Sequence, residues 1–288
     1  MVVPLLSESE SLLYCQGVVR RHDYDRYLMS LMAGGAARRG VLALLAFNVE
    51  VARTPEVATE FLLGEMRLQF WRDVLAEIFR GHPPRQHPVA LELAYTINKH
   101  MLEPKTFERM LVARHRELNP NPPASLADLE AFVCNTSGDL LALASLIIGG
   151  HDDAMIKIAR DVGIAYGICG LLRAVPFHAA QRRLYLPADL MQDRGVRAEE
   201  VFSRRSSEGL KSIVVSVATV AQQRLTHAQQ GVRELGRRSS GVFILGALAG
   251  LDLNRLREVQ HDPFSVQLQT QPMRRFLRMG TARITGRI

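Results

Sequence analysis

The sequence predicts an all-α protein, and three observations support this fold class. Apolar residues recur at helical spacing through most of the chain, and no stretch alternates apolar and polar residues for long enough to indicate a strand. Glycine and proline clusters separate the periodic segments. Between Asp161 and Arg173, apolar and small residues occupy every side of the helical turn. A helix that is apolar all round is buried, so we expect this segment to be the central helix of a bundle.

Capping residues and chain breakers predict where the helices of the first half begin and end. Ser7 and Glu10 form a capping pattern before the first apolar run, and Ser125 with Asp128 forms another. Pro55 precedes a long amphipathic helix that contains the only tryptophan, Trp71. The expected helices cover residues 12–19, 36–54, 56–79, 89–102, 105–118 and 125–149.

The central helix has a stripe of small residues at steps of three and four, which would let a backbone or a bulky ligand approach closely. Pro176 is expected to end or kink it. Its uncharged part has 11 residues, about half of the roughly 20 that span a bilayer. The apolar runs 213–220 and 242–251 are too short as well. The stripe consists of Ala159, Gly163, Gly167, Gly170 and Ala174.

The C-terminal part continues the helical pattern. Residues 184–187 are expected to be an extended crossover, and residues 207–235 a long amphipathic helix. The segment 272–288 contains five arginines and no acidic residue. It suits either a short interfacial helix on anionic lipid or a disordered, solvated end.

Composition indicates one domain over residues 1–288, because 47% of the residues are hydrophobic and no flexible linker divides the chain. The N-terminus resembles neither a signal nor a transit peptide. Cys15, Cys134 and Cys169 lack paired spacing, which favours reduced core thiols in the cytoplasm. The net charge of +7 favours an anionic partner. A nucleic acid is not expected, because no basic stretch interleaves aromatic residues.

Two stretches resemble the squalene and phytoene synthase family of head-to-head prenyl transferases. Residues 43–52 (ALLAFNVEVA) are similar to the helix that leads into the family's first aspartate-rich motif, and residues 171–178 (LLRAVPFH) with 183–187 (RLYLP) are similar to its second motif. The resemblance covers roughly residues 14–196 and implies an isoprenoid-synthase-type helical bundle. Residues after about Ser203 match no pattern of the family.

The family ionises a prenyl diphosphate with Mg²⁺ held by carboxylates of both motifs, and this sequence lacks most of them. The first motif's positions fall on Ala52, Arg53 and Glu56, so that only Glu56 is acidic. The second motif's positions fall on Gly170, Ala174 and His178. We therefore expect no catalytic residues, no metal and no cofactor, with Mg²⁺ required only if the chain is an active prenyl transferase.

A branch of the family without these aspartates, which includes the mitochondrial complex I assembly factor and its bacterial relatives, is more similar still. Its pattern is matched by HDYDRY at 22–27, MRLQFW at 66–71 and HPVALE at 87–92. The second-motif segment also fits, including Pro176 and His178. The resemblance implies an inactive protein that binds a partner during respiratory complex assembly, either cytoplasmic and peripheral at the inner face of a membrane or, in a eukaryote, in the mitochondrial matrix.

Two alternatives remain, an active prenyl transferase and an isoprenoid or lipid carrier that uses the groove beside the glycine stripe. Asn48, Glu50, Arg53 and His178 could form a polar cluster, or Glu50 and Arg53 could simply pair along one helix. Several further residues lie on the side where members of the family bind the diphosphate, and the resemblance makes them candidates for anion binding. They are Arg173, Arg182, Arg183 and Tyr185.

Overall fold

The first helix begins at the predicted capping pattern. The Ser7 backbone N–H donates to a Glu10 carboxylate oxygen at 2.9 Å, and the Glu10 N–H donates to the Ser7 hydroxyl at 3.3 Å. These bonds satisfy two of the four backbone N–H groups that every helix start leaves unpaired. Ser125 caps a later helix by accepting from the Asp128 N–H at 3.1 Å.

The computed structural model of the chain describes residues 7–58, 60–235, 241–268 and 272–288, and it assigns helices and no strand within these ranges. The all-α class predicted from the sequence is confirmed. The prediction that no leader peptide is present rests partly on residues 1–6, and these lie outside the described residues.

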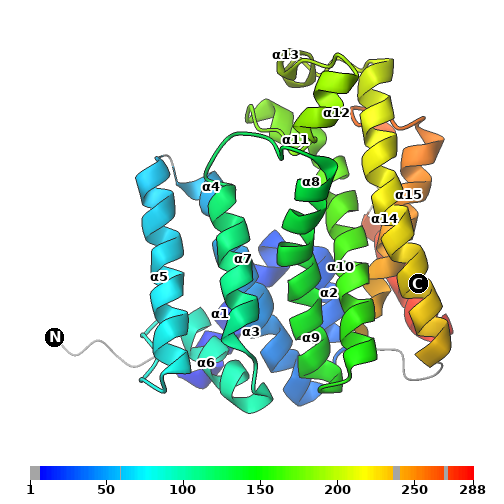
Figure 1. Cartoon of the computed structure of the whole chain (residues 1–288). Coiled ribbons are helices and arrows are strands. Elements are labelled where there is room, and N and C mark those ends of the chain that lie inside the picture. Colours follow the sequence, from blue (N-terminus) through cyan, green and yellow to red (C-terminus); the bar gives the residue numbers. More distant parts are fainter. Residues whose placement is uncertain (1–6, 59, 236–240, 269–271) are drawn as a thin grey trace. The chain divides into compact units, whose positions relative to one another are not determined.

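The chain forms two compact units, and each is discontinuous in sequence. The first comprises residues up to 119 together with 142–156, and the second comprises 120–141 together with 157–288. In the first unit, α1, α3 and α6 pack on one another and α5 packs on α7 (Figure 1). Its helices are α1 (Glu8–His22), α2 (Tyr24–Leu31), α3 (Gly35–Ala52), α4 (Thr54–Val57), α5 (Phe61–Phe79), α6 (Pro88–His100) and α7 (Pro104–Arg116).

The single helix predicted over residues 56–79 is wrong. Helix α3 ends at Ala52 with Arg53 as its C-cap, Pro55 lies in the first turn of the four-residue helix α4, and Ala58 has extended backbone angles before α5 begins. Proline has no N–H to donate to the turn before it, which accounts for the predicted break between α3 and α4. The break that divides residues 56–79 lies at Ala58, and Pro55 does not cause it. The remnant of the first motif lies at the α3–α4 junction.

In the second unit, α14 packs on α15 and α15 packs on α16 (Figure 1, yellow to red). Two helices, α9 (Asp139–Gly149) and α10 (Asp153–Arg173), pass from one unit to the other. The remaining helices are α8 (Leu126–Val133), the π-helix η1 (Cys134–Gly138), α11 (Val175–Ala180), α12 (Ala188–Asp193), α13 (Ala198–Phe202), α14 (Glu208–Leu235), η3 (Gly241–Phe243), α15 (Ile244–Glu258), η4 (Val266–Leu268) and α16 (Pro272–Thr285).

The glycine stripe of α10 is packed against η1. A Cβ on Gly163 would lie 2.8 Å from the Gly138 Cα and against the Ser137 carbonyl, and a Cβ on Gly167 would lie 2.6 Å from a Val133 methyl. At Gly163 the contacting atoms belong to the backbone of η1, so only glycine admits so close an approach. The predicted carrier groove is therefore wrong at Gly163 and Gly167, because the protein itself fills the space.

One helical stretch, Leu126–Gly149, is long and apolar enough to cross a membrane by length and composition. The sequence predicts a helix over residues 125–149, but this helix is not among the apolar runs compared with the length of a membrane span. However, 67% of the apolar window is buried inside the protein. Core helices of this length meet the same criterion, so the stretch is weak grounds for a membrane span.

The C-terminal segment is a helix packed against α15 and is not a disordered end. Arg275, Met279 and Ala282 form the buried face of α16. The Ile288 side chain packs against Gly246 of α15, where a Cβ added to the glycine would lie 3.1 Å from it. The Ile288 carbonyl accepts a hydrogen bond from the Gln229 side-chain amide at 2.7 Å. The disordered alternative for this segment is wrong.

Candidate functional site

The first-motif remnant is held in ion pairs within its own unit. Ala52 is the last residue of α3, Arg53 joins α3 to α4, and Glu56 is exposed on α4. The Arg53 Nε lies 3.5 Å from a Glu56 carboxylate oxygen, and its Nη1 lies 3.2 Å from the His22 Nε2. The one acidic residue left in this motif thus faces a cation.

His22 is kept neutral beside Arg53. Partial burial lowers the pKa of His22, and the positive charges of Arg53 and Arg21 lower it further. The neutral ring can accept a hydrogen bond from the Arg53 guanidinium. The matched pattern at residues 22–27 therefore supports the α3–α4 junction.

Glu50 pairs with Arg67 and not with Arg53. The Arg67 guanidinium contacts the Glu50 carboxylate, and its Nε donates to the Glu50 carbonyl at 3.3 Å. The predicted pairing of Glu50 with Arg53 along α3 is wrong, because the nearer guanidinium comes from α5. Asn48 is buried, and its side-chain oxygen has no hydrogen-bond partner among the described residues.

An aromatic cluster that includes His87 lies near enough to this ion pair for Glu50 and Arg67 to influence the pKa values of His87 and Tyr14. The centroid of the His87 ring lies 5.3 Å from that of the Trp71 ring and 6.2 Å from that of the Tyr14 ring. Burial lowers the pKa of His87, while burial and then the Glu50 carboxylate raise the pKa of Tyr14. The patterns at 66–71 and 87–92 thus meet within one unit, which their separation in the sequence did not indicate.

The second-motif remnant lies in the other unit and offers few polar atoms. A Cβ on Gly170 would meet nothing within 4 Å, and Ala174 follows at the end of α10. The ring of His178, on α11, lies 4.5 Å from that of Tyr185, which lies 6.0 Å from that of Phe132. Burial, helped by the charge of Arg183, lowers the pKa of His178 to about 4. The imidazole is therefore neutral at pH 7.

The arginines predicted to bind an anion have different environments. The Arg173 Nη1 lies 2.6 Å from an Asp252 carboxylate oxygen, so this guanidinium already has a buried carboxylate partner. The exposed Arg182 pairs with Glu199 at 2.5 Å and lies over the Phe202 ring. Arg183 is partly buried and takes part in at least one polar, ring or electrostatic interaction, so it is not a free guanidinium either.

Sequence reasoning missed the acidic partners of the second unit. Asp252 belongs to no sequence motif. The one feature of the sequence that could have indicated it is its position one helical turn after Leu248 on an otherwise apolar helix. Arg224 of α14 likewise pairs with Glu130 at 2.5 Å and with Asp161 at 3.1 Å. In the first unit, Glu92 is buried and pairs with Arg39 at 2.7 Å. These carboxylates hold helices together.

The motif residues do not fit the Mg²⁺ that the family resemblance implies. Hard divalent cations need several oxygen ligands, but Gly170 and Ala174 supply no side-chain donor and His178 supplies only nitrogen. Glu56 is paired with Arg53. Across the described ranges, no group of three or more His, Cys, Asp or Glu residues could hold a metal ion.

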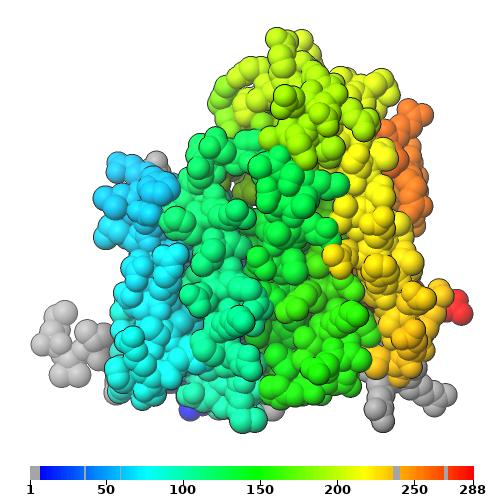
Figure 2. All heavy atoms as spheres, in the orientation of Figure 1, coloured from blue at the N-terminus to red at the C-terminus, as the bar shows by residue number. Residues whose placement is uncertain are grey.

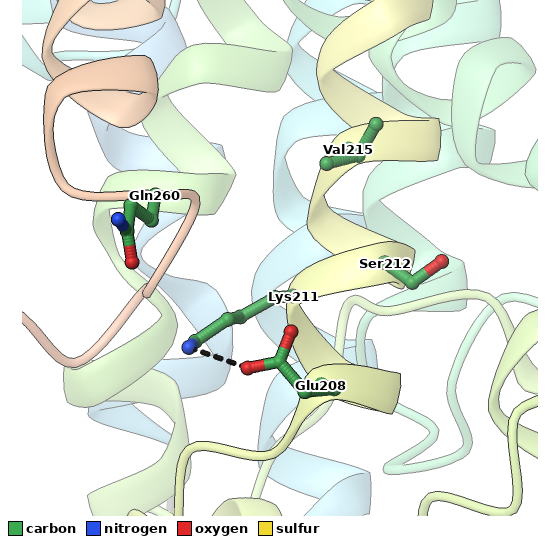
Figure 3. Close-up of a pocket in the computed structure, with 5 residues that line it drawn as sticks. All are labelled: Glu208, Lys211, Ser212, Val215 and Gln260. Atoms are coloured by element: carbon green, nitrogen blue, oxygen red, sulfur yellow. Dashed lines mark hydrogen bonds and ion pairs between the residues drawn. The ribbon is translucent and has the colours of Figure 1, made fainter.

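A groove at the start of α14 is lined by Glu208, Lys211, Ser212, Val215 and Gln260 (Figure 3). Its volume is about 430 Å³. The Lys211 ammonium donates to Glu208 at 2.8 Å, so its charge is already paired. The groove is open and shallow and contains no convergent set of polar groups of the kind that orients a ligand.

The exposed surface of the first unit includes an apolar patch around the N-terminal end of α5. Figure 2 shows this end of the helix, in light blue, at the surface. The side chains that form the patch are each between 44% and 61% exposed. They are Val57, Phe61, Leu62, Leu63 and Met66.

The helical architecture and the two motif remnants identify the class of protein. The chain belongs to the squalene/phytoene synthase family, whose sequence model matches residues 19–278. The expectation that the resemblance fades after about Ser203 is therefore wrong, since the match includes α14, α15 and part of α16.

Among relatives, the chain is 32% identical over 261 residues to the mouse protein named NADH dehydrogenase (ubiquinone) complex I, assembly factor 6, covering 91% of this chain and 78% of that protein. It is 31% identical to the human protein of the same name, with 89% and 77% coverage. Phytoene synthase 1 from Arabidopsis thaliana is 22% identical over 78% of this chain and 54% of its own length.

Solved structures show the same fold. A squalene synthase, HpnC from Alicyclobacillus acidocaldarius, superposes with a TM-score of 0.78 at 18% identity, covering 91% of this chain and 98% of that one. A dehydrosqualene synthase superposes with a TM-score of 0.81 at 17% identity, with 96% and 97% coverage. The isoprenoid-synthase-type bundle expected from the sequence is confirmed.

Proposed function

We propose that this chain is a catalytically inactive member of its family that acts as a binding or assembly factor for respiratory complex I. The observation that carries the proposal is the state of the motif positions: Glu56 is paired with Arg53, and Gly170 and Ala174 have no polar side-chain atom. A departing diphosphate carries several negative charges, and these positions offer no carboxylate set to gather the cations that would stabilise it.

Similarity to the assembly factor supports the choice of partner. The identity of 32% extends over 91% of the chain, whereas a phytoene synthase reaches 22% over 78%. The motif residues that are present support helix packing: Arg173 pairs with Asp252, and the His178 ring packs in a tilted arrangement against Tyr185. The role is therefore one of surfaces and not of chemistry.

Deletion of the gene in its own host tests the assembly role. We expect less assembled complex I on native gels and lower NADH oxidation in membranes, both restored by the wild-type gene and by a Glu56→Gln variant. Normal assembly in the deletion strain would disprove the assembly role. Restoration by wild type but not by Glu56→Gln would count against inactivity, since it would give this carboxylate a role of its own.

An active prenyl transferase is the alternative that the fold favours, since both solved structures named above are synthases of this kind. The purified chain with farnesyl or geranylgeranyl diphosphate and Mg²⁺ distinguishes the two. We expect no diphosphate release above the level without protein. Release that Mg²⁺ stimulates and chelation abolishes would refute inactivity.

We further infer that the chain works at the inner face of a membrane, or in the matrix in a eukaryote. The net charge of +7 supports this placement, because cytoplasmic leaflets carry anionic lipids. Fractionation of the host tests the membrane placement: recovery of the chain only in the soluble fraction at low salt would contradict a position at the membrane face.

A further inference from the structure

Helix α16 has two apolar faces, and only one of them is buried. Arg275, Met279 and Ala282 face α15. On the opposite side lie Met273, Phe276, Leu277 and Ile284, which are 66%, 50%, 59% and 87% exposed. Positions separated by three, four and eleven residues share one face of a helix. These four side chains therefore form a continuous outward stripe, called here the α16 stripe.

Unpaired arginines flank the α16 stripe. By helical position, Arg274 and Arg278 lie on one side of it and Arg283 lies on the other. None of these three guanidinium groups forms an ion pair with any residue that the structure describes, and α16 contains no acidic residue. The fourth arginine of the helix, Arg275, is buried and paired with Asp252. The outer surface of α16 thus combines apolar side chains with uncompensated positive charge.

We propose that the α16 stripe binds the surface of an anionic phospholipid bilayer. A helix of this kind lies in the interfacial plane with its apolar side chains among the acyl chains and its arginines extended to the phosphates. The positive charge of the arginines complements the phosphates of anionic lipids. Four apolar side chains on a helix about 21 Å long also offer much less than the roughly 800 Å² per partner that a specific protein interface buries.

The packing of the second unit orients the stripe. Asp252 holds Arg275 from the inner side of α16, and the C-terminal Ile288 packs against Gly246 of α15. The helix is therefore preformed and rigid on its inner face, and binding requires no coil-to-helix transition. This preorganisation lowers the entropic cost of binding to a surface.

Sedimentation of the full chain with vesicles tests the proposal. We expect binding to an equimolar mixture of phosphatidylglycerol and phosphatidylcholine, weak binding to phosphatidylcholine alone, and loss of binding as salt screens the charges. Arg274→Gln with Arg283→Gln should weaken binding roughly 30-fold, the effect of two arginines near an anionic surface. Phe276→Ser with Leu277→Ser should weaken binding to both vesicle types.

Two double variants on the first unit serve as matched controls. Arg20→Gln with Arg21→Gln removes the same charge from exposed positions of α1, and Leu62→Ser with Leu63→Ser removes exposed apolar side chains from α5. Both should bind as wild type does. Circular dichroism melts verify that every variant is folded.

Three results would overturn the proposal: no sedimentation of the wild type, equal binding to both vesicle types, or wild-type binding by the α16 variants. If the wild type instead forms a dimer that Phe276→Ser with Leu277→Ser dissociates, the stripe is a contact between copies and the lipid assignment is wrong. The lipid-binding proposal rests on the proposed placement at a membrane and is independent of the proposed role in complex I assembly. Normal complex I in a deletion strain would leave the vesicle result standing.

Discussion

Asp252 and Arg275 form a buried ion pair, with 2.6 Å between the carboxylate Oδ1 and the guanidinium Nη1. The other carboxylate oxygen of Asp252 lies 2.6 Å from the Arg173 Nη1. One side chain on α15 therefore joins the end of the central helix α10 to the C-terminal helix α16. An arginine in the second-motif segment thus supports packing, where the family resemblance suggested diphosphate binding.

Replacing Asp252 with asparagine should strongly destabilise the protein, by about 3–5 kcal/mol, because two guanidinium groups would lose their carboxylate in a largely buried site. Urea unfolding followed by circular dichroism measures the change. Arg274→Met, on the exposed side of α16, is the control and should change stability by no more than about 0.5 kcal/mol. Equal unfolding midpoints for Asp252→Asn and wild type would show that the carboxylate does not hold the helices together.

Gly163 and Gly170 on α10 should respond in opposite ways to alanine. A Cβ at Gly163 would collide with the backbone of Ser137 and Gly138, which cannot yield as a flexible side chain would. We expect a loss of about 1–3 kcal/mol from overpacking. At Gly170 the space is open, and alanine should stabilise the helix by about 0.5–1 kcal/mol.

Thermal melts of these two variants measure both effects. A stabilised Gly163→Ala protein would mean that η1 can move away from α10. A destabilised Gly170→Ala protein would mean that another group occupies the open space beside the second motif.

Protonation of His178 should contribute to acid sensitivity. Burial depresses its pKa in the folded protein to about 4, while the unfolded value is about 6.5. Between these values the unfolded chain binds the proton and the folded protein does not, so stability falls as the pH decreases through this window. At pH 5 the loss from this group amounts to about 2 kcal/mol.

His178→Phe keeps an aromatic ring beside Tyr185 and removes the titration. Urea unfolding at pH 7 and pH 5 should show a smaller loss for this variant than for wild type. The difference isolates His178, because His22, His87, His100 and His261, whose pKa values are also lowered, are unchanged in both proteins. Identical losses in both proteins would show that His178 is protonated in the folded state.

Two of the three cysteines should be protected from thiol reagents in the folded protein. Burial raises the pKa of Cys15 to about 12 and also raises that of the fully buried Cys169. The thiolate is the reactive form, so both groups should be inert at pH 8. Mass spectrometry after iodoacetamide treatment should find them unmodified until urea is added. Rapid labelling of Cys169 in the folded state would mean that α10 and α15 separate readily.

The sequence alone determined those features that depend on neighbouring residues. The capping box at Ser7, the cap at Ser125 and the helix end before Pro176 were predicted correctly, because each depends on the backbone bonds of a few consecutive residues. The buried character of α10 followed from its composition. The family was also recognised from short stretches, since those stretches keep their order and separation.

Only the tertiary structure decided which charges meet. Glu50 pairs with Arg67, 17 residues away, and Arg173 pairs with Asp252, 79 residues away. Helical spacing predicts partners three or four residues apart, so it favoured Arg53 for Glu50 and left Arg173 free for an anion. The glycine stripe is ambiguous for the same reason: a row of missing side chains shows that something approaches closely, but the packing of η1 against α10 decides what it is.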